Sequence, residues 1–327
     1  MTKKERLDAV LAGKKPDRIP YSFSCHFQGI PEKEKDYVKA HLDFYQESDA
    51  DFLKIMCDAL LYPFYQTIDC ASDWAKVTPL PRDDPFFVES IRRCREITDA
   101  VRDECYTYYT FFAPFSLIRN ATTITEKALA GRTADETVMA HLKEDEGAVL
   151  HALEVVAQDL VYLADKIIHE SGCKGIYQSV QGAEKGRMSA DEYARWVEPS
   201  DRIVIEGINR LSNRNILHMC SWAGFPNHLE YWKEYPAAVK NWGISIEGLS
   251  LSDGLRYFPN CVLMGGLDNR KGQVLYSGTK EEVKQSVWKL LDEMGDVPFI
   301  LGADCTVPSD IDTKRFHWVR EALDERR

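Results

Sequence analysis

The sequence has no excess of positive charge. Its 327 residues include 52 acidic and 41 basic side chains, which gives a net charge of −11 and a pI near 5.3. Nucleic acids and anionic membrane surfaces attract proteins that carry basic patches. We therefore expect neither of them to be a main partner of this chain.

Long hydrophobic runs are also missing. No stretch approaches the roughly 18 uninterrupted apolar residues of a membrane-spanning helix. Residues 1–23, MTKKERLDAVLAGKKPDRIPYSF, are basic but contain no apolar segment of the kind found in signal peptides. These absences predict a cytoplasmic protein that does not associate with membranes.

The cysteines do not form a pattern that indicates disulfide bonds. There are nine of them, an odd number, scattered through a long chain. Such usage is typical of a reduced compartment rather than of a disulfide framework. Because free cysteines behave as small buried hydrophobes, we expect most of them to be inert parts of the core.

What the sequence does contain is a series of eight apolar, β-prone runs. They occupy residues 18–25, 51–57, 106–115, 174–180, 215–220, 242–248, 261–267 and 297–305. Helical patterns lie between most of them, including residues 34–46, 145–172, 191–211 and 279–295. Alternating strands and helices predict a parallel sheet, and eight repeats favour a closed (β/α)8 TIM barrel.

Some segments lie outside this repeat. The long interval 58–105, between the second and third strands, predicts an insertion that contains extra helices, and further helices are expected at the N-terminus. No internal repeat, low-complexity tract or linker divides the chain. We therefore expect a single α/β barrel domain over residues 1–327.

Three candidate metal ligands stand where two of the strands end, which is where (β/α)8 barrels place functional residues. His218 and Cys220 close the fifth run, NILHMC, and share one face because strand side chains alternate. Cys305 closes the eighth run. One nitrogen and two sulfur ligands suit Zn²⁺, with a fourth position open for catalysis. Buried core thiols and a hydrogen-bonded histidine would explain the same residues, so both interpretations stay open.

Three carboxylates are candidates for catalysis. Asp304 adjoins Cys305, and its alternative role is to cap the loop at the end of the strand. Glu247 ends the sixth predicted strand and is a candidate hydrogen-bond partner of His218, or else a solvated loop carboxylate. Glu184 follows the fourth strand as a substrate contact or a plain turn residue. His26 and Asp58, which follow the first two strands, receive no predicted role.

The chain resembles the uroporphyrinogen decarboxylase superfamily and, within it, the cobalamin-dependent methyltransferases that act with small corrinoid proteins. The similarity is strongest over 215–308, in NILHMCSW, NWGISIEG, VLMGGLDN, SGTKEEVKQSVWKLL and FILGADCTVPSD, and is weaker upstream. The resemblance implies a (β/α)8 barrel in which His218, Cys220 and Cys305 bind catalytic zinc.

The resemblance also implies a reaction. A methyl group would move between methylcobamide, delivered by a separate corrinoid protein, and a small-molecule methyl donor or acceptor. The sequence contains no Asp-x-His-x-x-Gly segment to bind cobalamin itself. Two thiolates and one imidazole make zinc electron-rich, which favours a thiol substrate. The direction of transfer and the oligomeric state, a homodimer included, are left open.

The sequence departs from these relatives at several points. The decarboxylase has an arginine-rich segment where this chain has YSFSCHFQGIPEKE, so porphyrinogen decarboxylation is not expected. Ser221 and Trp222 replace the glycine that usually follows the zinc ligands, and SDIDTKRFHW replaces the usual segment beyond Cys305. The alternatives are a carboxy-lyase acting on a different carboxylated substrate, or a non-catalytic metal-binding barrel.

Overall fold

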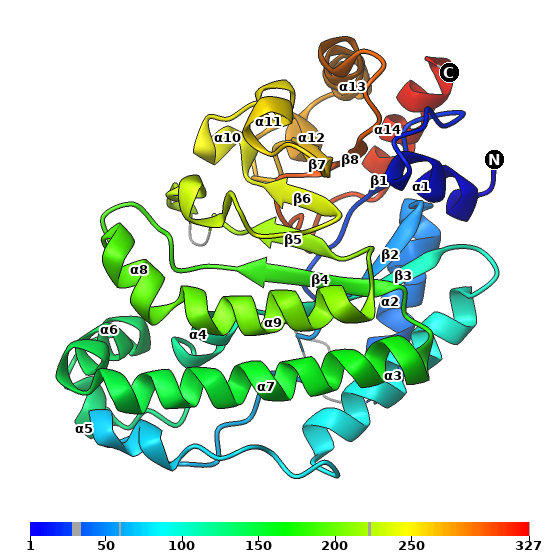
Figure 1. Ribbon diagram of the computed structural model, residues 1–327. Helices are drawn as coiled ribbons and strands as arrows, with labels where there is room; N and C mark the ends of the chain where they lie inside the picture. Colours follow the sequence, from blue (N-terminus) through cyan, green and yellow to red (C-terminus); the bar gives the residue numbers. More distant parts are fainter. Residues whose placement is uncertain (28–33, 59, 222–223, 327) are drawn as a thin grey trace.

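The computed structural model describes residues 1–27, 34–58, 60–221 and 224–326. Eight parallel strands form one sheet in the order β1-β8-β7-β6-β5-β4-β3-β2 (Figure 1). The strands are β1 Tyr21–Ser22, β2 Phe52–Ile55, β3 Tyr106–Phe112, β4 Gly175–Val180, β5 Ile216–Met219, β6 Val239–Trp242, β7 Val262–Leu267 and β8 Ile300–Ala303. With helices around the sheet, this arrangement confirms the predicted (β/α)8 barrel.

The barrel is nearly closed, and its seam lies between β1 and β2. Backbone Asp51 N–H donates to the Tyr21 carbonyl at 2.8 Å, and the Asp51 carboxylate accepts from the Tyr21 N–H at 2.9 Å. The same buried carboxylate pairs with Arg6 at 2.6 Å and Arg18 at 2.7 Å. Because both of its oxygens are paired with cations, the buried charge of Asp51 holds the two edge strands together.

Helices precede, connect and follow the strands. They are α1 Lys3–Leu11, α2 Glu34–Ser48, α3 Pro85–Val101, α4 Pro114–Ile118, α5 Glu126–Leu129, α6 Ala134–Glu144, α7 Glu146–Ser171, α8 Ala190–Trp196, α9 Glu198–Leu211, α10 Ile244–Glu247, α11 Leu251–Tyr257, α12 Val274–Ser277, α13 Lys280–Met294 and α14 Lys314–Glu325. The predicted insertion after β2 holds the 3₁₀ helix η1 (Ala71–Lys76) and α3, and a further 3₁₀ helix, η3 (Leu229–Trp232), follows β5. Helices α4 to α6, between β3 and β4, were not predicted.

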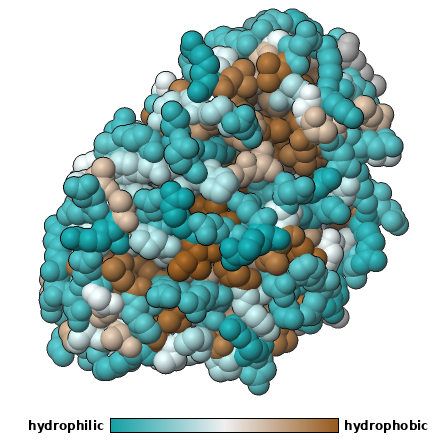
Figure 2. All heavy atoms as spheres, in the orientation of Figure 1, coloured by the Kyte–Doolittle hydropathy of each residue, from teal (hydrophilic) through white to brown (hydrophobic). Residues whose placement is uncertain are grey.

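Among the helices that the structure describes, only α7 is long and apolar enough to cross a membrane. However, 61% of its most apolar window is buried inside the protein. It packs closely against α9, where a Cβ at Gly207 would come within 2.5 Å of Val161 on α7. In Figure 2, hydrophobic residues show along the line between these two helices, and others show in the upper part of the same face. We conclude that α7 is a core helix.

The predicted sixth strand, 242–248, was wrong. The strand is β6, Val239–Trp242, and residues Ile244–Glu247 form the short helix α10. Two polar residues, Lys240 and Asn241, concealed the true strand because neither looks apolar in the sequence. Both are buried, since the Lys240 ammonium donates to the Lys233 carbonyl at 2.7 Å and the Asn241 amide is hydrogen-bonded inside the barrel.

Candidate functional site

The barrel interior has two layers of side chains, which follow from the alternation of residues along each strand. The lower layer is apolar, and α1 covers it with Leu7 and Val10. Its strand residues are Phe52, Tyr108, Tyr177, Ile216, Val239, Met264 and Ile300. Two positions further along the strands, toward their carboxyl ends, stand polar residues: Lys54, Thr110, Ser179, His218 and Asn241. The site is built on this upper layer.

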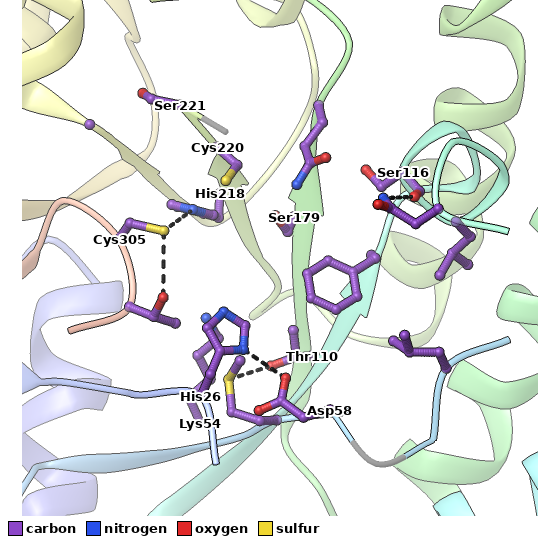
Figure 3. Close-up of a pocket in the computed structure, with 18 of the residues that line it drawn as sticks. His26, Lys54, Asp58, Thr110, Ser116, Ser179, His218, Cys220, Ser221 and Cys305 are labelled. Atoms are coloured by element: carbon purple, nitrogen blue, oxygen red, sulfur yellow. Dashed lines mark hydrogen bonds and ion pairs between the residues drawn. The ribbon is translucent and has the colours of Figure 1, made fainter. Parts of the chain in front are cut away.

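The three predicted metal ligands come together at the mouth of the barrel (Figure 3). His218 is on β5, Cys220 follows that strand directly, and Cys305 follows β8. One ligand atom from each lies within 4.8 Å of the others, and Cys305 Sγ is 3.4 Å from His218 Nε2. Residues separated by 85 positions in the sequence thus meet because β5 and β8 are strands of one barrel.

Asn241 fixes the orientation of the His218 ring. Its Oδ1 lies 2.5 Å from His218 Nδ1, and its Nδ2 donates to the carbonyls of Met264 at 3.0 Å and Ala303 at 3.3 Å. Since the amide nitrogen is committed to these carbonyls, Oδ1 must accept the proton of His218 Nδ1. The lone pair of Nε2 then faces Cys305, as a metal ligand requires.

The donor set fits a tetrahedral zinc ion. Zinc–sulfur and zinc–nitrogen bonds of about 2.3 and 2.0 Å place such ligand atoms roughly 3.5–3.8 Å apart. The Cys305 Sγ–His218 Nε2 distance of 3.4 Å is close to this range, and all three atoms lie within 4.8 Å of one another. Three ligands around an accessible cavity leave the fourth position to a substrate, the arrangement typical of catalytic zinc.

The two sulfurs shift each other's pKa in opposite directions. A hydrogen bond from Cys220 lowers the pKa of Cys305 well below its ordinary value, and His218 and Lys54 add to this against the effect of burial. The pKa of Cys220 is raised well above its usual range, because it donates to Cys305 and is buried. This shift favours the thiolate form of Cys305, the form that binds soft cations.

A cavity of about 850 Å³ opens beside these ligands. The wall across from the cluster is largely apolar and is made by Met56, Leu61, Tyr62, Pro63, Phe64, Phe112, Leu117 and Ala121. Arg270 is the one arginine among the described residues of the lining, and it is paired with Asp268 at 2.9 Å. A polyanionic substrate would therefore meet few cations here.

A second polar group faces the cavity from β1 and β2. His26 Nδ1 lies 2.7 Å from Asp58 Oδ1, and the Phe27 N–H donates to Asp58 Oδ2 at 3.0 Å. Burial raises the pKa of Asp58, but its hydrogen bonds with His26 and Phe27 outweigh this and hold it below its ordinary value. Asp58 is thus an anion with committed partners. Sequence reasoning missed both residues, since nothing indicated which of the neighbouring pairs 25–26 and 57–58 faces inward.

Asp304 lines the cavity, as predicted for a residue beside Cys305. Its Oδ2 accepts a hydrogen bond from the Ser245 N–H at 2.9 Å, while its buried Oδ1 has no partner among the described residues. Burial raises the pKa of Asp304 to about 6. One oxygen of this buried carboxyl group therefore has no hydrogen-bond partner among the described residues.

Glu247 was predicted to end a strand and to hydrogen-bond His218, and the structure shows neither. Glu247 lies on α10 and accepts hydrogen bonds from Ser221 at 2.7 Å and from the Asn227 N–H at 2.8 Å. It therefore holds the loop after β5 rather than the His218 ring, which Asn241 holds. The error follows from the misplaced sixth strand, which also hid Asn241. Trp222, singled out as a departure from the relatives, lies outside the described residues.

Glu184 is buried beside two arginines and does not belong to the described lining of the cavity. Its carboxylate oxygens lie 2.8 Å from Arg119 Nη1 and 2.8 Å from Arg187 Nε. Asp135 joins the same network through Arg187 at 2.6 Å. These contacts tie the loop after β4 to α4 and α6, so the geometry gives Glu184 a structural position.

Comparison with known proteins found one matching family and several similar structures. The model of the uroporphyrinogen decarboxylase family matches residues 63–326. No curated protein matches the sequence. A methyltransferase from Methanosarcina mazei is similar in structure, with a TM-score of 0.72 and 15% identity over 99% of each chain.

Glycoside-cleaving enzymes share the barrel as well. Endo-glycoceramidase II from Rhodococcus sp. has a TM-score of 0.52 and 9% identity over 91% of this chain and 78% of its own. The β-mannanase of the blue mussel Mytilus edulis has a TM-score of 0.51 and 11% identity over 94% of this chain and 92% of its own. At such identities the likeness concerns the fold, and function has to be argued from the site.

Proposed function

The chain belongs to the uroporphyrinogen decarboxylase family, and from that premise we propose that it is a zinc-dependent methyltransferase. It moves a methyl group between methylcobamide, carried by a separate corrinoid protein, and a small substrate, for which we propose a thiol. The observation that carries this proposal is the meeting of His218, Cys220 and Cys305 beside a cavity.

The residues of the site have distinct tasks in this reaction. Zinc supplies Lewis acidity, which lowers the pKa of a substrate thiol so that a nucleophile exists at neutral pH. His218 offers Nε2 because Asn241 accepts the proton of Nδ1. Two cysteine sulfurs and one imidazole favour exchange of thiolate ligands over strong Lewis acidity. The apolar wall excludes water and holds the body of the substrate.

Two exposed apolar side chains near the cavity favour the binding of a protein partner there. Leu61 lines the cavity and is 52% exposed, and Phe225, next to the lining residue Gly224, is 55% exposed. Exposed apolar side chains beside a reactive site are typical of an interaction surface. A corrinoid protein docked at this rim would bring its methyl group to the mouth of the barrel.

A carboxy-lyase is the second candidate, and the hydrogen-bonded pair His26–Asp58 favours it. This pair could exchange a proton with a substrate on the side of the cavity away from the cysteines. The shortage of unpaired arginines limits such an enzyme to substrates with few carboxylates.

Metal analysis and a methyl-transfer assay test the two candidates together. We expect about one zinc per chain in protein purified without chelators, lost in both Cys220→Ser and Cys305→Ser. Methylcobalamin and a panel of thiols should give methyl thioethers with the unaltered protein but with neither of these two variants. Cys70→Ser is the matched control, because this cysteine is exposed and outside the cavity. A protein without zinc whose activity survives both substitutions would contradict the methyltransferase and support the lyase.

A further inference from the structure

Lys54 places a positive charge in the barrel beside the metal ligands. It is on β2, is only 6% exposed, and lines the cavity (Figure 3). Its ammonium lies 3.9 Å from the centre of the Tyr177 ring. Of the described residues, none accepts a hydrogen bond from Lys54 Nζ or forms an ion pair with it. The aromatic face therefore positions this cation without neutralising it.

An unpaired ammonium in a buried position is costly unless an anion approaches it. Other buried cations of this protein have partners: Arg6 and Arg18 share Asp51, and Lys240 donates to a backbone carbonyl. The nearby carboxylate of Asp58 is already bound to His26. Apart from Asp58, the groups that can balance Lys54 are the cysteine sulfurs or a molecule bound to them.

The surroundings of Lys54 act on its pKa in two opposite directions. Burial lowers the pKa of Lys54, and the neighbouring charges of Cys305, Cys220, Cys57 and Asp58, in that order, offset this effect. The geometry places Lys54 on the side of the predicted zinc site, because the Tyr177 ring that its ammonium contacts lies 5.9 Å, centre to centre, from the His218 ring.

Charge counting gives Lys54 a role in substrate selection. Two cysteine thiolates balance the two charges of a zinc ion, so a neutral fourth ligand would leave Lys54 uncompensated. A thiolate brings one negative charge, which Lys54 balances. We propose that Lys54 selects an anionic sulfur, the thiolate of a small thiol, as the molecule that joins His218, Cys220 and Cys305. This inference rests on the proposed function and deepens it.

The reaction itself removes the charge that Lys54 attracts. A thiol releases its proton to solvent when it binds, and its sulfur then forms a bond to the methyl carbon. The cobalt–carbon bond breaks, and its electron pair stays on cobalt. The thioether that results is neutral, so it has no charge for the Lys54 ammonium to attract. The same ammonium thus favours binding of the thiol and release of the product.

A binding experiment on the Co²⁺-substituted protein tests this role, because thiolate ligation of Co²⁺ has a visible absorption signature. The probes are 2-mercaptoethanol and its methylated product 2-(methylthio)ethanol, titrated at several pH values. In Lys54→Met we expect thiol affinity to fall about 10- to 100-fold and the pH midpoint of thiol binding to rise by about one to two units. The metal content and the affinity for the thioether should not change.

The controls separate charge from packing. Lys54→Arg keeps the charge and should retain most of the thiol affinity. If Lys54→Met does not fold, Lys54→Gln takes its place and should show the same loss of thiol affinity. Lys240→Met removes another buried lysine of the barrel, one that lies outside the cavity, and should leave thiol binding unchanged.

Two outcomes overturn the assignment in distinguishable ways. If Lys54→Met binds metal and its thiol affinity and pH midpoint match the unaltered protein, Lys54 does not select the thiolate, although the methyltransferase proposal stands. If the unaltered protein binds no metal, or shows no thiolate absorption, the proposed function fails and this role fails with it. Reduced metal affinity in Lys54→Met would also contradict the assignment, since a nearby cation opposes metal binding.

Discussion

The two ends of the barrel interior are made by the same strands but have opposite chemistry. The lower layer, including Phe52, Ile216 and Val239, is apolar and is sealed by α1. Two positions further along the same strands stand Lys54, His218 and Asn241, respectively. Because this spacing keeps side chains on one face, a single strand contributes both to stability at its start and to chemistry near its end.

The difference between the layers shows where the barrel holds side chains whose pKa values depart from their ordinary values. The lower layer is buried and apolar, and the upper layer faces a cavity with polar side chains that are themselves buried. Charges interact strongly there, which is why the pKa values of Cys220, Cys305 and Lys54 all depart from their ordinary values. The following substitutions test whether the two layers act independently.

The largest effect is expected for Phe52→Ala in the lower layer. Phe52 is fully buried, and its ring packs on Tyr108 with centroids 5.1 Å apart. Loss of the ring should lower the free energy of unfolding by about 3–5 kcal/mol, measured by urea denaturation. The zinc content of the folded protein should not change. Phe225→Ala, at an exposed position, is the control and should cost no more than about 0.5 kcal/mol. Zinc loss from folded Phe52→Ala would show that the layers are not independent.

An intermediate effect is expected for Asn241→Ala in the upper layer. This change frees the His218 ring to turn, because its Nδ1 loses the acceptor that fixes it. Zinc affinity should fall about 10- to 100-fold, as measured by competition with a chelator. Asn215→Ala removes a buried amide that is outside the cavity lining and does not contact the cluster, so it should leave zinc affinity unchanged. Unchanged zinc affinity in Asn241→Ala would mean that His218 is oriented by other contacts.

The smallest effect is expected for Tyr177→Phe, at the boundary between the layers. The Tyr177 ring belongs to the lower layer, while its hydroxyl donates to Asn241 Oδ1 at 2.9 Å. Removal of one buried hydrogen bond should cost about 0.5–1.5 kcal/mol of stability. Zinc affinity should change only a few fold, because the Met264 and Ala303 carbonyls still hold the Asn241 amide. A zinc loss as large as that of Asn241→Ala would make the hydroxyl part of the site.

Much of the fold followed from local patterns, and the failures were local too. Each of seven predicted runs contains one whole strand of the barrel. The eighth run, 242–248, shares only Trp242 with β6. Apolar Ile244 and Ile246 resembled a strand, while Lys240 and Asn241 concealed one. Their burial depends on a carbonyl from the preceding loop and on partners from β5, β7 and β8, which the segment itself does not reveal.

Part of the site could be found by the same means. His218, Cys220 and Cys305 were recognised because strand ends are functional in barrels and because soft ligands are chemically distinctive. Lys54, His26 and Asp58 were not recognised. A lysine inside an apolar run carries no mark of the face it occupies, and a histidine beside a cysteine does not show which of the two points inward.

The sequence by itself determined the eight-strand barrel and the three candidate soft ligands at its mouth, since periodicity and residue chemistry are local properties. The tertiary structure alone decided that Asn241 orients His218, that Asp58 pairs with His26, and that the Lys54 ammonium lies over the Tyr177 ring. These relations join strands that are far apart in the chain. Their energies depend on distance and on the exclusion of water, and both arise only when the barrel closes.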